Sequence, residues 1–410
     1  MSLLPQTERV QAASPESAPP QSSSPHAATP QSLRIAVVGN PDNRRITLLK
    51  AAAESLGLAE PRVVPWLDVL AGRAAFEAGE VVRIDSPGED AEVTRLLRGE
   101  SEPVDMYRVE GTRAWYEGFV AALEKLHVAI EAAGARALAS AQETAVAFDK
   151  ARCSALLAEH GVPVPEAIPG VVDYASLRAA LAERTWERVH VKIRHGSSAS
   201  GVVALTVRGR RGLWATTSTE LHRTPDGYEL YNSLKVRHYR HEREVSALID
   251  HLAPDGLHVE QTINLLHIDG THSDMRLVTV GGKVTHAVGR VSHLPITNLH
   301  LGGKRREIAT FLERYGEERW LKVIDLAERT AACFPESHCL GIDILSDRER
   351  DYVGEVNAYG DLLPNLLGLP GTFGEGVDTY TAQLRSLHSL RSLSTLQSPS
   401  SLTPLTTPSS

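Results

Sequence analysis

Two short β-branched segments near the end of the chain constrain its fold more than any other feature. Residues 341–345 and 352–357 flank a polar run, and this pattern predicts an antiparallel hairpin. With the turn centred between them, Asp343 lies opposite Glu355. Asn357 shares the face of Glu355 because strand side chains alternate. The hairpin is therefore expected to bring three oxygen ligands together on one face of a sheet.

Asp343, Glu355 and Asn357 are candidate ligands for Mg²⁺, with Mn²⁺ as an alternative. Magnesium favours hard oxygen ligands, commonly one or two carboxylates, and completes its octahedron with water and substrate phosphates. The chain is therefore expected to carry phosphate-binding elements elsewhere. The plainer interpretation is an edge strand with solvated polar side chains.

The stretch His195–Gly201 supplies a candidate phosphate loop. After His195 it contains only Gly, Ser and Ala, so backbone N–H groups and hydroxyls can approach phosphate oxygens closely. Lys192 precedes the loop on a predicted strand and Lys150 lies on the preceding helix, which brackets a polyphosphate with two ammonium groups. The loop serines lack a GxSxG elbow and are read as phosphate-loop hydroxyls, not nucleophiles.

The beginning of the chain predicts a different architecture. Residues 33–40 form an apolar strand and turn, 44–56 a helix ending at Gly57, and strands and helices alternate up to about residue 133. Such alternation favours a parallel sheet with crossover helices. The glycines of a GxGxxG fingerprint are absent, which argues against a dinucleotide-dependent oxidoreductase.

Length and composition limit the class of protein to which the chain can belong. The 410-residue chain is long enough for two or three packed units, and its net charge of -8 gives no basic footprint for nucleic acid. Three cysteines without a CxxC pair fit a reducing, cytoplasmic setting, and no apolar run is long enough to span a membrane. The 17 histidines show no zinc-ligand spacing.

Proline and glycine positions divide the chain. A helix predicted over 143–160 ends at Gly161 before two prolines, which indicates a boundary near residue 140. Hairpins are predicted around the glycine loop and around Gly281-Gly282. The expected units are a disordered tail (1–32), an α/β domain (33–140), a lid lobe (141–258), a metal-binding lobe (259–384) and a second disordered tail (385–410).

From Phe148 onwards the order of these elements resembles the ATP-grasp superfamily, nearest to RimK-type ligases. The resemblance covers roughly residues 148–370. It rests on the lysine strand and glycine loop, the hinge-like Val259-Glu-Gln-Thr-Ile263, Asp274-Met-Arg276, the element Asn298-Leu-His-Leu-Gly-Gly303, and the two metal strands. It implies an α/β fold, α+β in the ATP-grasp part, in which an N-terminal Rossmann-like pre-ATP-grasp domain precedes a two-lobed ATP-grasp domain.

The resemblance also implies roles for individual residues. Lys150 and Lys192 would bind ATP phosphates or the adenine edge, Gln261 and Thr262 the adenine, and Asp274 the ribose. The whole nucleotide-binding set would be Lys150, Lys192, Gly196, Ser197, Ser198, Gly201, Glu260, Gln261, Thr262, Asp274 and Asn298. Arg276 and Arg290 are the candidate catalytic residues, which would stabilise phosphate and oxyanion charge.

The implied activity is that of a carboxylate–amine ligase that uses ATP and Mg²⁺, passes through an acyl phosphate and releases ADP and phosphate. Its partners would be a small amino acid or a peptide or protein acceptor. Two alternatives stay open: an enzyme that forms an ester or lactone in a peptide, and a catalytically silent ATP-binding regulator. The sequence leaves the acceptor, the nucleophile and a homo-oligomeric state undetermined.

An apparent insertion lies beside the glycine loop at about residues 208–244. It carries Trp214, Tyr228, Tyr231 and Tyr239 among many Arg and His residues. Two interpretations stay open: recognition of a substrate peptide, or enlargement of the lid.

Overall fold

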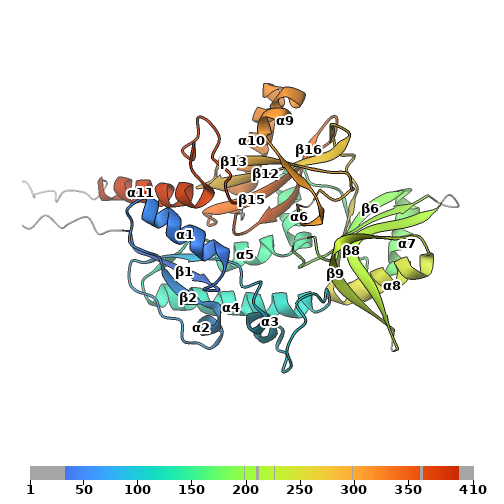
Figure 1. The fold of residues 1–410 in the computed structure, drawn as a ribbon, viewed down its shortest axis with the longest axis horizontal. Coiled ribbons are helices and arrows are strands. Elements are labelled where there is room, and N and C mark those ends of the chain that lie inside the picture. The colour runs from blue at the N-terminus through green and yellow to red at the C-terminus, as the bar shows by residue number, and fades with distance from the viewer. Residues whose placement is uncertain are drawn as a thin grey trace, which may run out of the picture. The chain divides into compact units, whose positions relative to one another are not determined.

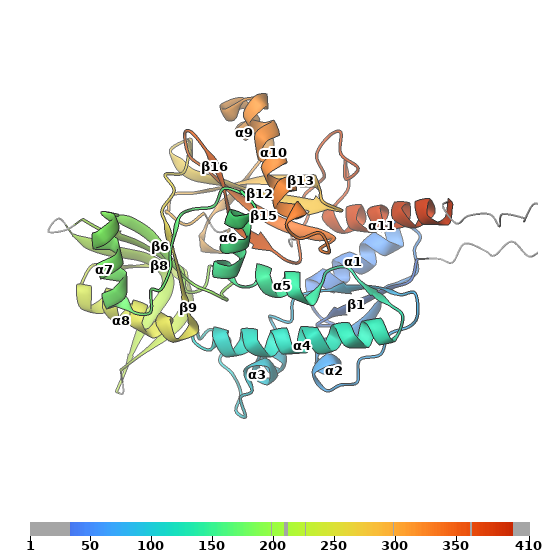
Figure 2. The same cartoon turned by 180° about the vertical axis from the view of Figure 1, so that it is seen from behind.

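The computed structural model describes residues 33–197, 199–208, 212–225, 227–297, 299–360 and 363–396. These residues form three β-sheets with helices packed against them (Figures 1 and 2). The predicted tail 1–32, the end of the second tail (397–410), Ser198 and Asn298 lie outside the described residues.

The first sheet is parallel, as predicted, with strand order β2-β1-β3-β4. Its elements are β1 (Ile35–Gly39), α1 (Arg44–Ser55), β2 (Arg62–Pro65), α2 (Trp66–Leu70), β3 (Val81–Ile84), α3 (Ala91–Arg98), α4 (Thr112–Ala132) and β4 (Arg136–Ala137). Both faces of this sheet are covered, which is why β1 reads as a continuous apolar run. Ala36 and Val38 face the core beneath α4, whereas Ile35 and Val37 face α1 and α11 (Thr379–Leu396) (Figure 1).

The second sheet is antiparallel, with order β5-β10-β6-β7-β8-β9. Its strands are β5 (Ala167–Ile168), β6 (Arg188–Ile193), β7 (Val203–Val207), β8 (Leu213–Thr224), β9 (Gly227–Tyr239) and β10 (Leu257–Gln261). Helices α7 (Tyr174–Arg184) and α8 (Glu242–Leu252) and the 3-10 helix η2 (Ala253–Asp255) accompany it. The sheet reaches Gln261, three residues beyond the predicted lobe boundary. We call this unit the lid.

The third sheet has the order β14-β13-β12-β15-β16 and is also antiparallel. Its strands are β11 (His267–Ile268), β12 (Thr271–Val280), β13 (Lys283–Ser292), β14 (Lys304–Arg306), β15 (Cys339–Ser346) and β16 (Asp351–Asn357). Helices α9 (Ile308–Tyr315) and α10 (Glu317–Ala332) pack on one face, and the 3-10 helix η3 (Leu299–Leu301) precedes β14. Gly281 and Gly282 both have positive φ angles, which confirms the predicted hairpin turn between β12 and β13.

Two predicted features differ from the structure. The helix expected over 143–160 is divided into α5 (Ala141–Ala147) and α6 (Lys150–Glu159), because the Asp149 side chain accepts hydrogen bonds from the first backbone N–H groups of α6. The expected tail from residue 385 is helical as far as Leu396. Leu384 and Leu387 are buried against the first sheet, and this burial stabilises a helix in a segment whose composition is largely polar.

The lid also contacts the first domain through a short segment, Tyr107–Glu110. Val109 donates a backbone hydrogen bond to Leu230 of β9 (2.9 Å) and is a buried member of the lid core. The Asp255 carboxylate accepts the backbone N–H groups at the start of α4, from Gly111 (3.0 Å) and Arg113 (2.8 Å). The β8–β9 hairpin, which makes up most of the apparent insertion, therefore extends the lid sheet (Figure 1) and pairs along its edge strand with the Tyr107–Glu110 segment.

Candidate active site

One face of the third sheet carries both predicted catalytic arginines and three predicted binding carboxylates, Asp274, Asp343 and Glu355. Asp343 and Glu355 are paired directly across β15 and β16, as the sequence predicts, and a bulge follows Asp343. Asp343 also lies opposite Arg276 on β12, and Asp274 lies opposite Arg290 on β13. The alternate side chains of these strands pack into the apolar core with α10. A single face therefore gathers both arginines and the carboxylates.

The carboxylates on this face are already paired with arginines. Asp343 accepts from the Arg276 guanidinium through both oxygens, with an Nη2–Oδ2 distance of 3.0 Å, and its Oδ2 lies 3.0 Å from Arg290 Nη2. Burial alone would raise the pKa of Asp343, but the two arginines lower it to about 2. Arg290 meanwhile holds Asp274 with two hydrogen bonds of 2.7 Å. The arginines are thus fixed in place by the acids between them.

Asp274 has a further partner in the Thr297 hydroxyl, which donates to Oδ2. Both of its oxygens are therefore engaged within the protein. A ribose contact by Asp274 would require it to exchange one of these partners.

The lid contributes a second buried ion pair. Lys192 on β6 pairs with Glu260 on β10, and Glu260 also contacts His258 (3.2 Å). Burial acts against both charges, yet the pair keeps them: the pKa of Glu260 falls to about 2, and the pKa of Lys192 is raised. After Glu260, the carboxylates Glu355 and Asp343 also raise the pKa of Lys192. Lys192 therefore lies within electrostatic reach of the third-sheet acids.

Lys150 connects the two sheets. It is the first residue of α6 and directly follows Asp149, the N-cap of this helix. Its Nζ atom lies 2.9 Å from Glu355 Oε1 and donates to the Gly196 carbonyl of the glycine loop (2.5 Å). The Lys150 side chain thus bridges the loop and the predicted metal strand.

The glycine loop folds back over Ile193, the last residue of β6. A Cβ atom at Gly196 or Gly201 would lie 2.5 Å or 2.8 Å from the Ile193 side chain, which explains the small residues. Ser197 accepts a backbone hydrogen bond from Ser200 (2.8 Å), which tightens the loop.

The predicted adenine contacts lie at the end of β10. Gln261 is exposed, and its backbone N–H donates to Glu166 (2.8 Å). The Thr262 hydroxyl lies 3.2 Å from His190 Nδ1, and its backbone N–H donates to Arg188 (3.3 Å). Both residues directly follow Glu260, the carboxylate that pairs with Lys192.

A pocket between α6, β10 and β16 brings Lys150, Glu260 and Glu355 together. Sequence reasoning missed its apolar wall. The wall residues are Ala147, Cys153, Leu157, Val164, Pro165, Val353 and Val356. Burial, more than its charged neighbours, raises the pKa of Cys153 to about 12, so this residue acts as a neutral wall.

The sequence does contain a signal for this wall: the apolar spacing of α6, followed by Val164-Pro165. From the sequence alone, the segment Val164-Pro165 resembles a linker and not part of a pocket.

Asn357 lies at the end of β16, where its amide nitrogen donates to the Gly341 carbonyl (3.3 Å). This contact fixes the plane of the amide beside the carboxylate pair.

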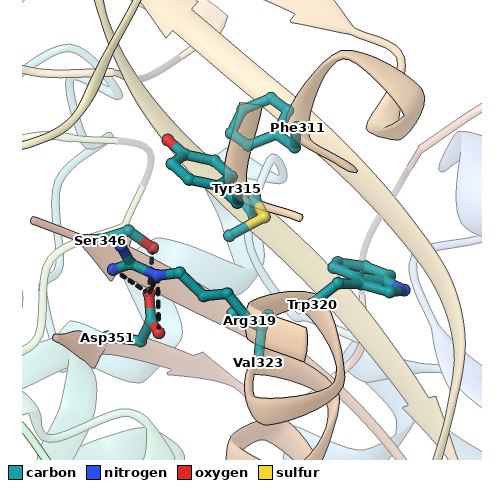
Figure 3. Close-up of a pocket in the computed structure, with 8 residues that line it drawn as sticks. Phe311, Tyr315, Arg319, Trp320, Val323, Ser346 and Asp351 are labelled. Carbon is teal, nitrogen blue, oxygen red and sulfur yellow. Dashed lines mark hydrogen bonds and ion pairs between the residues drawn. The ribbon is translucent and has the colours of Figure 1, made fainter. Parts of the chain in front are cut away.

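Another pocket lies on the opposite face of the third sheet (Figure 3). Its charged group, Arg319, bonds to Asp351 (2.8 Å) and to the carbonyls of Asp347 and Arg350 in the turn between β15 and β16. Figure 3 shows Arg319 directed at Asp351, with Tyr315 and Trp320 along the wall. Arg319 therefore stabilises the turn of the β15–β16 hairpin, which carries Asp343 and Glu355.

The described part of the chain shows neither a cluster of metal-ligating side chains nor a membrane-spanning helix. It contains no group of three or more His, Cys, Asp or Glu side chains placed to hold a metal ion. The predicted magnesium ligands, Asp343, Glu355 and Asn357, would supply two carboxylates and one amide, a donor set that Mg²⁺ accepts when phosphates and water complete it. Among the described helices, none has the length and apolar character that a membrane crossing requires.

Comparison with known proteins agrees with this architecture. A family model described as YheC/D-like ATP-grasp matches residues 144–360, which is more than half of the chain. No curated protein sequence matches at a significant level.

Among solved structures, the D-cycloserine synthetase DcsG has 18% identity over 87% of this chain and 99% of its own, with a TM-score of 0.53. The VanG D-Ala:D-Ser ligase from Enterococcus faecalis has 15% identity over 88% and 100% of the two chains (TM-score 0.49). The ATP-grasp ligase PsnB, complexed with a minimal precursor, has 17% identity over 87% and 99% (TM-score 0.48). Of these three, DcsG alone has a TM-score above 0.5, and at 18% identity its similarity shows the fold alone.

Proposed function

Because this chain belongs to the YheC/D-like ATP-grasp family, we propose that it is an ATP-dependent carboxylate–amine ligase. Its acceptor is a small amino acid or a peptide, and the product is an amide. The observation that carries the proposal is the bridge formed by Lys150 between the glycine loop and Glu355. It supports a site in which the lid holds the phosphates directly over the predicted metal strand.

In this proposal each part of the site has one task. The apolar wall of the pocket packs against the flat faces of the adenine, and Gln261 and Thr262, which follow the pocket residue Glu260, hydrogen-bond with its polar edge. Lys150, Lys192 and the glycine-loop N–H groups bind the phosphates. Asp343, Glu355 and the Asn357 carbonyl oxygen would hold Mg²⁺, which would neutralise the negative charge that develops on the phosphates.

The reaction proceeds in two displacements. An oxygen of the acceptor carboxylate attacks the γ-phosphorus, and the bond to ADP breaks to give an acyl phosphate. An amine nitrogen then attacks the acyl carbon, loses a proton, and expels phosphate to leave the amide. Arg276 and Arg290 face the same side as the carboxylates and stabilise the oxyanion and the departing phosphate. The lid excludes water, which would otherwise hydrolyse the acyl phosphate.

The test measures ADP release from Mg-ATP in the presence of pooled amino acids and peptides. Acceptor-dependent release is expected, and Glu355→Ala should reduce it at least about 100-fold, because a charge-stabilising group is lost. Glu349→Ala, in the exposed turn of the same hairpin, is the matched control and should behave as the unmodified protein. ATP binding without release in any pool would favour a silent regulator, and no ATP binding would refute the nucleotide site.

A further inference from the structure

The site neutralises its own charges without a ligand. Its four cationic side chains are Lys150, Lys192, Arg276 and Arg290, and its four anionic side chains are Asp274, Glu260, Asp343 and Glu355. Each proposed metal-binding carboxylate is among these pairs. The cations therefore contact both oxygens of Asp343 and Oε1 of Glu355, atoms that a metal ion would need.

The two metal carboxylates are held differently. Asp343 is buried and is bound by both arginines, which belong to neighbouring strands of the same sheet. Glu355 is about one-third exposed and is held by Lys150, which comes from α6. The same ammonium group also holds the Gly196 carbonyl (2.5 Å). Lys150 thus restrains a metal ligand and the phosphate loop with one charge.

We infer that Lys150 is a coupling latch: it withholds Glu355 from the metal until nucleotide phosphates draw its ammonium group away. This inference rests on the proposed function and concerns the regulation of the same site. A triphosphate is a stronger partner for an ammonium group than one carboxylate and a carbonyl, since it carries several negative charges. Transfer of Lys150 to the phosphates releases Glu355 and Gly196 together. Metal and nucleotide then bind as one unit, and each tightens the binding of the other.

The latch makes a prediction of unusual sign. Removal of the ammonium group should strengthen the binding of metal alone, because Glu355 is freed, and should weaken the binding of nucleotide alone, because a phosphate contact is lost. Structural damage would weaken both. A third possibility is a purely electrostatic effect, in which removal of any positive charge from α6 strengthens metal binding. A variant that removes a different positive charge from the same helix distinguishes this effect from the latch.

The experiment uses the full chain and titrates Mn²⁺, with free ion followed by electron paramagnetic resonance, and titrates ADP by calorimetry in the presence of EDTA. Lys150→Met should bind Mn²⁺ at least about 10-fold more tightly than the unmodified protein and ADP about 10-fold more weakly, each about 1.4 kcal/mol. Arg152→Met removes one positive charge from the same helix without touching Glu355, and should leave both affinities unchanged.

The outcomes separate the latch from the proposed function. If Lys150→Met binds Mn²⁺ no more tightly than Arg152→Met while ADP with Mg²⁺ binds the unmodified protein, the latch is refuted and the nucleotide site stands. If ADP binds neither with nor without Mg²⁺, the nucleotide site itself is refuted, and the latch falls with it. Circular dichroism of both variants establishes that each is folded before titration.

Discussion

At the scale of single residues, burial sets protonation unless a charged partner opposes it. Glu260 stays ionised because Lys192 outweighs the cost of burial. His338, which precedes β15, lies near the cations Arg136 and Arg83 instead. Its Nε2 atom is buried without a hydrogen-bond partner among the described residues, and burial, followed by the effect of both arginines, lowers its pKa to about 4. This histidine is therefore neutral in the folded protein near pH 7.

His338 should make stability depend on pH. The unfolded chain protonates this residue below its ordinary pKa of 6.5, whereas the folded protein does so only below about 4. The free energy of unfolding therefore falls as the pH drops through this window, by about 3 kcal/mol at most, at roughly 1.4 kcal/mol per pKa unit. His338→Gln removes this contribution. Urea denaturation between pH 7 and pH 4 should show a shallower decline for the variant, and parallel curves would contradict the prediction.

The predictability of the site differs from residue to residue. The pairing of Asp343 with Glu355 follows from the strict alternation of strand side chains and from the position of a polar turn, both of which are local. The arginines that hold Asp343 come from two other strands. Their pairing depends on the register of the whole sheet, which no local pattern specifies. Lys150 was expected to bind phosphate, but its contact with Glu355 requires knowledge of the tertiary fold.

At the scale of elements, the first domain depends on a close crossing of α3 and α4. Gly118 lies within α4, where glycine is unfavourable for helix formation, and a Cβ atom there would lie 2.0 Å from the Leu97 carbonyl oxygen. The glycine is therefore required by packing against a backbone atom that cannot rotate away. Helix propensity alone gives the opposite expectation for this position.

Gly118→Ala distinguishes these two effects. Propensity would stabilise the variant by about 1 kcal/mol, whereas overpacking costs about 1–3 kcal/mol, and the fixed carbonyl should let overpacking dominate. We expect a lower midpoint in urea. Ala121→Gly, at an exposed position of the same helix, calibrates the propensity term and should cost about 1 kcal/mol. A more stable Gly118→Ala protein would show that the helices separate without cost.

Element boundaries were predicted less well than element types. The strands and the two-glycine hairpin were found because their apolar alternation and turn residues are local signals. The break between α5 and α6 was missed, although Asp149 is a favourable N-cap residue, because the apolar spacing continues across it. The helix beyond residue 385 was missed because its composition is polar and its stability comes from burial of Leu384 and Leu387 against a distant sheet.

At the scale of the whole molecule, the first domain and the lid share structural groups. The Asp255 carboxylate, only 6% exposed, belongs to the lid yet accepts the first N–H groups of α4. The aromatic ring of Tyr116, in the second turn of α4, stacks on His195 at the start of the glycine loop, with ring centroids 3.8 Å apart. Helix α4 is thereby joined to the lid at two points near its start.

Asp255→Ala should loosen both units. Loss of the two N–H contacts is expected to cost about 2 kcal/mol in the free energy of unfolding, measured with urea. Hydrogen exchange should accelerate at the start of α4 and also in β9. Asp90→Ala removes the cap of α3 within the first domain and is the matched control, with faster exchange confined to that domain. Changes limited to residues 253–255 would contradict the shared arrangement.

The pairing of Tyr107–Glu110 with β9 also bears on how such a chain can be recombined. Val109, 1% exposed, fills the lid core from a position over thirty residues before the segment that sequence alone assigns to that lobe. The lid is thus encoded in two separate stretches of the gene. Recombination with a homologous gene at codon 141 would combine the lid of one protein with the Tyr107–Glu110 segment of the other. Recombination at about codon 100 would keep this segment and the lid from the same protein.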